Sequence, residues 1–393
     1  MLSVLNFALV ALSIALFLVT LFLAAEVIAS FGERPSQSVS LTTRGRIGVV
    51  IPAHNEREGV AATVAAVRVE LRDIDRVIVV ADNCDDDTAE IARPAGAVAI
   101  ERKDKARCGK GYALQFGVDH LRHDPPETVV FIDADCRPAP GAIARIAERA
   151  AYLQRPVQAL YLMKPPEGAG AKAAVSAFAW LLLNRVRMSG LQRLSGVTRL
   201  TGAGMAFPWR IISESDLASG EIVEDLALTL KMVEAGAPPV LDLGAVVTSE
   251  LARSDQGAAT QRARWEHGSL RMAARMVPAL LLRGARGDLK SFAMAFDLLV
   301  PPLTVLAALI VFMLIVSSLA ALGGSPAALA WTLGSAVVFA GAIALAWAAY
   351  GRAVLPPSML AAIGPYLLGK ARVYGAEGRR SAKRWTRTDR GGQ

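Results

Sequence analysis

The sequence lacks the marks of several common protein classes. Its three cysteines, Cys84, Cys108 and Cys136, form no C-x-x-C pair and no even framework, which favours reduced cytosolic thiols. A Walker A loop is absent, because position 104 is not glycine and neither Ser nor Thr follows Lys110. No basic stripe interleaved with aromatic residues is present either, so we expect no nucleic-acid partner.

Charge is missing from long stretches near both ends of the chain. Residues 4–25 carry none, and no Lys or Arg precedes them, which favours an uncleaved membrane span over a signal peptide. Residues 292–319 and 327–350 are two more candidate spans. The apolar segment 351–369 is short and contains three prolines. We expect it to be re-entrant or interfacial, with a third C-terminal span as the alternative.

The basic residues predict the orientation. Residues 370–393 hold eight Lys or Arg and two Asp or Glu, a net +6 out of +8 for the whole chain, whereas the loop 321–326 has no charge. The positive-inside rule then places the middle of the chain and the C-terminus in the cytoplasm, at the inner membrane. Anionic membrane lipids explain the high pI better than nucleic acid does.

The middle of the chain alternates strands with helices. Strands are expected at 46–52, 75–81, 97–101 and 128–132, and helices at 58–71, 87–92 and 109–121. This alternation predicts an α/β fold with a doubly wound, mostly parallel sheet. We expect an N-terminal transmembrane helix at 1–30, a linker at 31–45, a cytoplasmic α/β domain at 46–270 with an interfacial helix near 172–190, an interfacial helix at 271–290, two transmembrane helices at 291–350, the membrane segment 351–369 and a basic cytoplasmic tail at 370–393.

The most informative feature is Asp133-Ala134-Asp135, which follows the apolar run Thr128 to Ile132. Open α/β sheets bind ligands at the carboxyl ends of their strands. Carboxylates there, supplemented by phosphate oxygens, suit Mg²⁺ or Mn²⁺. The pattern therefore predicts a metal-bridged nucleoside diphosphate.

Other polar clusters fall where they can join this site. Glu56 and Asp82 follow two further strands, although turn and capping roles are the alternative. Lys110 opens a helix after a basic, glycine-flanked segment, which favours an anion site over a solvated loop. Glu224 and Asp225 lie in the first turn of a predicted helix, where capping is the simpler reading.

A segment near residue 261 contains residues suited to bind phosphate. Gln261 and Arg264 lie three residues apart on one helical face, followed by Trp265. Arginine binds phosphate in a bidentate manner, and tryptophan stacks on sugar faces. Taken alone, the segment also fits an amphipathic helix with a snorkelling arginine beside a membrane.

In this order the motifs resemble the membrane-bound family 2 inverting glycosyltransferases, which include cellulose, chitin, hyaluronan and poly-N-acetylglucosamine synthases. The matching segments cover about residues 46–270 and are 49–56, Asp82, 109–111, 133–135, 201–204, 224–225 and the Q-x-x-R-W at 261–265. The resemblance implies a GT-A-type nucleotide-sugar-binding domain, a donor that is expected to be a UDP-sugar, and a Mg²⁺ or Mn²⁺ cofactor.

The resemblance also implies a role for each matching residue. Asp225 would be the general base, and Asp133 and Asp135 would hold the metal. Donor nucleotide contacts would come from Glu56, Asp82, Lys110 and Asp133, and diphosphate contacts from Gln261 and Arg264. Acceptor contacts would come from Gly202, Gly204, Glu224 and Trp265.

Three functions remain open at this stage. The first is transfer of a sugar to a lipid-linked or polymeric glycan acceptor in exopolysaccharide or cell-envelope assembly. The second is a processive synthase, for which three spans would need further segments, oligomerisation or envelope-assembly partner proteins. The third is a catalytically silent membrane-assembly subunit, against which the complete set of carboxylates argues.

Overall fold

The structure is a computed structural model that describes residues 2–32, 45–252 and 255–370. Its chain forms two compact units. Of the described residues, the sheet unit comprises 45–169, 197–252 and 255–269, and the helical unit comprises 2–32, 170–196 and 270–370. The linker 31–45 falls almost entirely outside the described residues, and so does the basic tail after residue 370.

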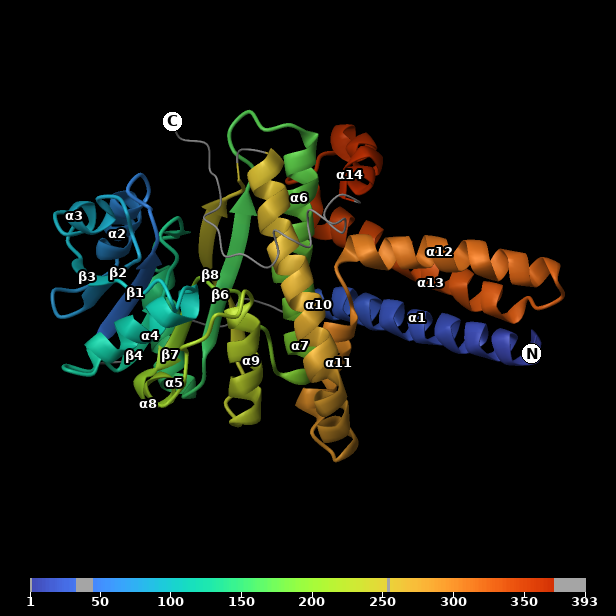
Figure 1. Cartoon of the computed structure of the whole chain (residues 1–393), viewed down its shortest axis with the longest axis horizontal. Coiled ribbons are helices and arrows are strands. Elements are labelled where there is room, and N and C mark those ends of the chain that lie inside the picture. Colours follow the sequence, from blue (N-terminus) through green and yellow to red (C-terminus); the bar gives the residue numbers. More distant parts are fainter. Residues whose placement is uncertain (1, 33–44, 253–254, 371–393) are drawn as a thin grey trace. The chain divides into compact units, whose positions relative to one another are not determined.

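The sheet unit is built on one eight-stranded sheet (Figure 1). Its strand order is β3-β2-β1-β4-β7-β6-β8-β5. The strands are β1 (Ile47–Ala53), β2 (Arg76–Asp82), β3 (Val98–Arg102), β4 (Thr128–Phe131), β5 (Arg137–Pro138), β6 (Val157–Lys164), β7 (Met205–Pro208) and β8 (Val240–Glu250). The helices are α2 (Val60–Arg68), α3 (Thr88–Ala92), α4 (Lys110–Leu121), α5 (Ala142–Leu153), α8 (Trp209–Ser213), α9 (Glu224–Glu234) and the first part of α10 (Asp255–Ala285).

The first half of the sheet confirms the prediction. Strands β1 to β4 pair in parallel. The segments that connect them contain α2, α3 and α4, which supply the crossovers that parallel strands require. The side chains of β1, β2 and β4 are mostly buried. Val50 pairs in register with Ile78 and with Phe131, and all three belong to one core cluster. Parallel pairing brings the carboxyl ends of β1, β2 and β4 to the same edge, so the polar segments that follow them lie along that edge.

The second half is mixed, so the prediction of a mostly parallel sheet holds only in part. Strand β7 runs antiparallel to both neighbours, β4 and β6, and β5 runs antiparallel to β8. Strand β7 begins directly after the turn at 201–204 and hydrogen-bonds Gly204 N to Phe131 O at 2.9 Å. The antiparallel strand therefore carries this turn to the end of β4, where Asp133 follows.

Among the described residues, the helical unit contains three helices long and apolar enough to span a membrane, at Val4–Ser30, Leu303–Leu322 and Ala327–Gly351. They belong to α1 (Leu2–Ser30), α12 (Leu303–Leu322) and α13 (Ala327–Ala346) with its π-helical extension η2 (Trp347–Gly351). These helices lie side by side (Figure 1). Asn6 donates to Ser325 at one end of the α1–α13 pair, and Ser30 donates to Tyr350 at the other.

The remaining helices of this unit include both predicted interfacial segments. They are α6 (Ala171–Leu181), the π-helix η1 (Leu182–Arg187), α7 (Met188–Ser195), the second part of α10, α11 (Leu289–Leu299), η3 (Pro357–Ala362) and α14 (Ile363–Lys370). The predicted span at 292–319 is two helices, α11 and α12, because Pro301 and Pro302 interrupt it. The segment 351–369 is short and helical, and its membrane role stays a prediction.

A buried ion cluster links three helices of this unit. Arg187 Nε donates to Glu26 Oε2 at 2.7 Å, and Arg187 Nη2 donates to Asp297 Oδ1 at 2.8 Å. All three residues are at most 4% exposed. Charges buried at this depth require partners, so the cluster fixes α1, η1 and α11 to one another.

Candidate active site at the carboxyl edge of the sheet

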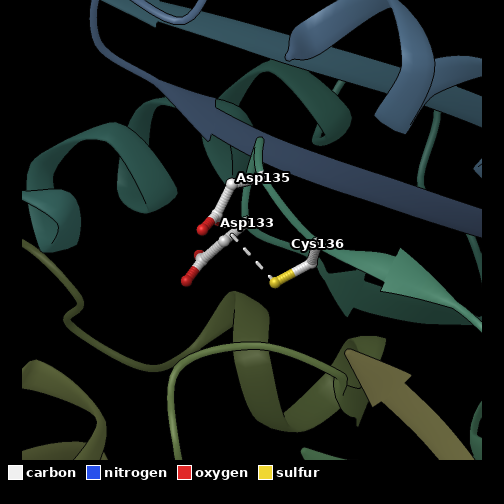
Figure 2. Close-up of side chains that lie close together, drawn as sticks. All are labelled: Asp133, Asp135 and Cys136. Carbon is white, nitrogen blue, oxygen red and sulfur yellow. Dashed lines mark hydrogen bonds between the residues drawn. The ribbon is translucent and has the colours of Figure 1, made fainter. Parts of the chain in front are cut away.

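The Asp-x-Asp segment lies in the loop that follows β4 (Figure 2). Oxygen atoms of Asp133 and Asp135 and the sulfur of Cys136 lie within 4.8 Å of one another. Figure 2 shows both carboxylates pointing to the same side of this loop. The loop is anchored at Ala134, whose carbonyl accepts a hydrogen bond of 2.5 Å from Thr63 Oγ1.

The donor set of this loop fits a hard divalent cation. Two carboxylates are the ligands that Mg²⁺ and Mn²⁺ prefer. Cys136 is fully buried, and burial, followed by the neighbouring carboxylates, raises the pKa of its thiol well above the usual range. A protonated thiol is a poor ligand, so Asp133 and Asp135 are the residues suited to hold the ion.

Lys110 links the Asp-x-Asp loop to two other segments. Its ammonium nitrogen lies 2.5 Å from Asp133 Oδ1, 3.6 Å from Glu224 Oε1 and 2.9 Å from Gly202 O. Burial disfavours the charge, but the carboxylates of Asp133, Glu224 and Asp225 outweigh that effect and hold the pKa of Lys110 above its ordinary value. Lys110 therefore lies among the acidic side chains as their internal counter-ion.

Gly202 lies at the centre of the site. A Cβ there would lie 3.1 Å from Lys110 Nζ, 3.6 Å from Asp225 Oδ2 and 4.0 Å from Asp133 Oδ2. Its φ of +86° is also a conformation that glycine adopts most easily. The bare backbone at this position places no side chain between Lys110, Asp133 and Asp225. The acceptor contact expected of Gly202 stays a prediction. Gly204 has φ +70° and packs against Ala159 and Val247 instead.

Glu224 and Asp225 form the first turn of α9, as predicted. Burial raises the pKa of Glu224 to about 7, although Lys110 opposes the shift. Burial also raises the pKa of Asp225, and the positive charges of Lys110 and Arg199 oppose it. A carboxylate with a raised pKa is a stronger base, so the direction of this shift favours proton acceptance by Asp225.

The Q-x-x-R-W segment lies on α10, and the charge of Glu224 acts on its arginine. Burial lowers the pKa of Arg264, and the nearby carboxylate of Glu224 opposes this shift. Its neighbours Gln261 and Trp265 are half-buried. Their proposed contacts with diphosphate and acceptor stay predictions.

The residues expected near the nucleoside lie farther along the same edge. Asp82 is 4% exposed, and its Oδ1 lies 2.6 Å from Arg102 Nη1. Burial raises the pKa of Asp82, and Arg102 opposes this shift. Glu56 lies beside the Asp-x-Asp loop, since a Cβ at Gly59 would contact both Ala134 O and Glu56 Oε2. Their nucleotide contacts stay predictions.

Sequence reasoning missed two residues that shape the site. Gln158 is fully buried in β6, where its side chain accepts from Thr201 N at 2.9 Å and donates to Ala203 O at 2.8 Å. Thr229 Oγ1 accepts from Leu200 N and donates to Asp225 O, both at 2.9 Å. A glutamine inside an apolar strand was the available signal for the first. Nothing in the sequence distinguished the second from other threonines.

Comparison with known proteins gives the family and the fold. The profile described as "Glycosyltransferase like family 2" matches residues 44–268. A mannosyltransferase of known structure, PcManGT from Pyrobaculum calidifontis in complex with GDP-Man and Mn²⁺, superposes with a TM-score of 0.54 at 18% identity, covering 95% of this chain and 98% of that one. This likeness supports a GT-A-type fold for the chain.

A curated relative matches a shorter region. The low-salt glycan biosynthesis hexosyltransferase Agl6 of Haloferax volcanii is 37% identical over 92 residues, which are 23% of this chain. The match spans about a fifth of that relative, 21% of its length. Since the family profile covers more than half of the chain and includes every strand of the sheet unit, this protein belongs to glycosyltransferase family 2.

Proposed function

We propose that the protein is an inverting hexosyltransferase that moves a sugar from a nucleoside diphosphate to a hydroxyl of a membrane-associated glycan or lipid acceptor. One observation carries this proposal. Lys110, Asp133 and Asp225 surround Gly202, with the base candidate 3.6 Å and the metal-ligand candidate 4.0 Å from the position of its missing Cβ. The groups that we assign to donor binding and to proton acceptance therefore lie around the same glycine.

Asp225 acts as the general base in this proposal. The acceptor hydroxyl gives its proton to the Asp225 carboxylate while its oxygen forms a bond to the anomeric carbon. The bond from that carbon to the diphosphate oxygen breaks on the opposite face, so the configuration inverts. A positioned base of this kind contributes about 10²–10⁴-fold.

The leaving diphosphate needs positive charge. Arg264 and Lys110 supply it from the protein, and Gln261 adds an amide donor. A divalent cation held by Asp133 and Asp135 would add Lewis-acid stabilisation. The PcManGT structure contains Mn²⁺ and GDP-mannose, which supports this pairing of ion and nucleotide sugar for a protein of the same fold.

Membrane attachment defines the acceptor class. The helical unit has three helices able to span a bilayer, and the hexosyltransferase Agl6 belongs to glycan biosynthesis. We therefore place the enzyme in the inner membrane with its sheet unit in the cytoplasm, acting on a lipid-linked or polymeric glycan of the cell envelope. A processive synthase is the alternative, and product length separates the two.

A donor screen tests this function. Purified protein in native-lipid nanodiscs is incubated with UDP- and GDP-sugars, and the products are analysed by mass. We expect one donor to be consumed, activity to stop in EDTA and Mg²⁺ or Mn²⁺ to restore it. A single added sugar supports simple transfer, and a ladder supports the processive alternative. Undiminished turnover in chelator would remove the metal role, and no turnover with any donor would favour a silent assembly subunit.

A further inference from the structure

The charged residues of the helical unit lie outside its long apolar helices, apart from Glu26 near the end of α1. Residues 2–25 and 298–351 contain no Asp, Glu, Lys or Arg. The described ranges of this unit, 2–32, 170–196 and 270–370, nevertheless contain eleven Lys or Arg against three Asp or Glu, a net +8. Two of the three acidic residues, Glu26 and Asp297, form buried ion pairs with Arg187. The remaining charge of this unit is therefore almost entirely positive.

Aromatic side chains and arginines meet at one end of the α1–α13 pair. The guanidinium carbon of Arg185 lies 4.9 Å from the ring centroid of Tyr350, and that of Arg352 lies 5.4 Å from Trp347. Phe31 packs on Tyr350 with centroids 5.4 Å apart. These distances are typical of cation–π and aromatic pairs. Both guanidinium groups are thus held on the one π-helical turn η2.

The arrangement is well supported by neighbouring contacts. Trp347 Nε1 donates to Leu355 O at 2.8 Å, which fixes the indole. Arg185 Nη1 donates to Ser189 Oγ at 3.2 Å. Arg193 lies at the same end, since its Nε would be 3.3 Å from a Cβ at Gly32. We call Phe31, Arg185, Arg193, Trp347, Tyr350 and Arg352 the arginine–aromatic face.

The length of α1 places this face at headgroup depth. From Asn6, which bonds Ser325, to Ser30, which bonds Tyr350, an α-helix rises about 36 Å at ~1.5 Å per residue. The hydrocarbon core of a bilayer is ~30 Å thick. When the Asn6 end lies at one surface, the face lies at the other, where tryptophan, tyrosine and arginine are enriched.

We propose that the arginine–aromatic face binds the phosphate groups of anionic phospholipids in the surrounding bilayer. Arginine matches phosphate geometry through parallel N–H donors. The aromatic rings under Arg185 and Arg352 hold the guanidinium groups in place, which lowers the entropy lost on binding. The occupant is the phosphate of a lipid, because the face lies at the end of the apolar helices. Lipid chains that cover these helices would bring their phosphate groups to the arginines.

Lipid selectivity of the reconstituted full-length protein tests this proposal. The association of spin-labelled phosphatidylglycerol, relative to spin-labelled phosphatidylcholine, is measured in phosphatidylcholine bilayers. We expect a preference for phosphatidylglycerol that falls about fivefold per arginine in the double variant Arg185→Gln/Arg352→Gln, since a basic residue near a membrane surface contributes ~1 kcal/mol. The control Arg286→Gln removes an exposed arginine of the same unit outside the face and should change the preference far less.

Several outcomes would overturn the proposal. These are an unchanged preference in the double variant, an equal loss in the control, or removal of the preference by millimolar inorganic phosphate, which would indicate a site for the free ion. Should the double variant fail to insert, the single variant Arg352→Gln at an exposed position answers the same question. The readout involves no sugar transfer, so its failure leaves the proposed enzymatic function unaffected, and the reverse also holds.

Discussion

The substitution Lys110→Met should have opposite effects on binding of the metal and of the donor. Lys110 Nζ lies 2.5 Å from Asp133 Oδ1, and the two side chains are 19% and 27% exposed. Coulomb's law at this distance gives about 2 kcal/mol in bulk water and about 7 kcal/mol at an effective dielectric constant of 20. Because both groups keep some exposure, we take the lower figure, which corresponds to more than tenfold in affinity.

We therefore expect Lys110→Met to bind Mn²⁺ at least about tenfold more tightly in the absence of donor. The cation no longer competes for Asp133. Donor affinity in the presence of Mn²⁺ should fall instead, because a positive charge beside the diphosphate is lost. Free Mn²⁺ is measured by electron paramagnetic resonance, and donor binding by calorimetry.

The control for this experiment is Lys105→Met, which removes an exposed lysine from the loop before α4. It should leave both affinities unchanged. Weaker or equal Mn²⁺ binding by Lys110→Met would show that the lysine does not compete with a metal, and the assignment of Asp133 as a ligand would then be wrong.

Three further predictions follow from the structure. Gly202→Ala should cut transfer more than tenfold, because its Cβ would lie 3.1 Å from Lys110 Nζ and its φ of +86° strains any residue other than glycine. The control is Gly168→Ala, where φ is +73° but no atom lies within 4 Å, so the backbone strain is similar and the crowding is absent. Equal losses of transfer in both variants would argue against the site. The transfer rate should rise with pH along an acid limb, since the base must be deprotonated and burial raises the pKa of Asp225; a midpoint at or below the ordinary value of about 4 would contradict this. Arg187→Met should destabilise the protein by about 3–5 kcal/mol, seen as a lower Tm in detergent, whereas Arg286→Met at the surface should change stability by less than about 0.5 kcal/mol.

The sequence predicts the first half of the sheet well, and the reason is physical. Strands β1, β2 and β4 are rich in β-branched residues and bounded by polar turns, and each connection from β1 to β4 contains a helix. Patterns of this kind specify parallel strands strongly. The Asp-x-Asp loop and the helix start at Glu224 could be located for the same reason, because each adjoins a well-defined element.

The second half could not be predicted in this way. The antiparallel strand β7 is four residues long, too short for its direction to be read from side-chain alternation. Its position follows from long-range contacts, such as the hydrogen bonds of Gln158 with the turn at 201–204. Similarly, the position of Lys110 between Asp133 and Glu224 depends on three segments that are far apart in the chain.

The arginine–aromatic face could not be predicted from the sequence either. Each of its six residues is ordinary for a membrane-associated helix, and the sequence separates Phe31 from Tyr350 by more than three hundred positions. Only the packing of α1 against α13 and η1 brings them together.

The central claim is that Asp225 accepts the proton of the acceptor while the Asp-x-Asp loop serves the donor. Transfer and donor binding measured side by side for Asp225→Asn test it most directly. We expect transfer to fall by about 10²–10⁴-fold, with donor affinity nearly unchanged, because the substitution removes a base and leaves the shape of the site. If transfer and donor binding fell by the same factor, Asp225 would be a donor-binding residue and the claim would be wrong.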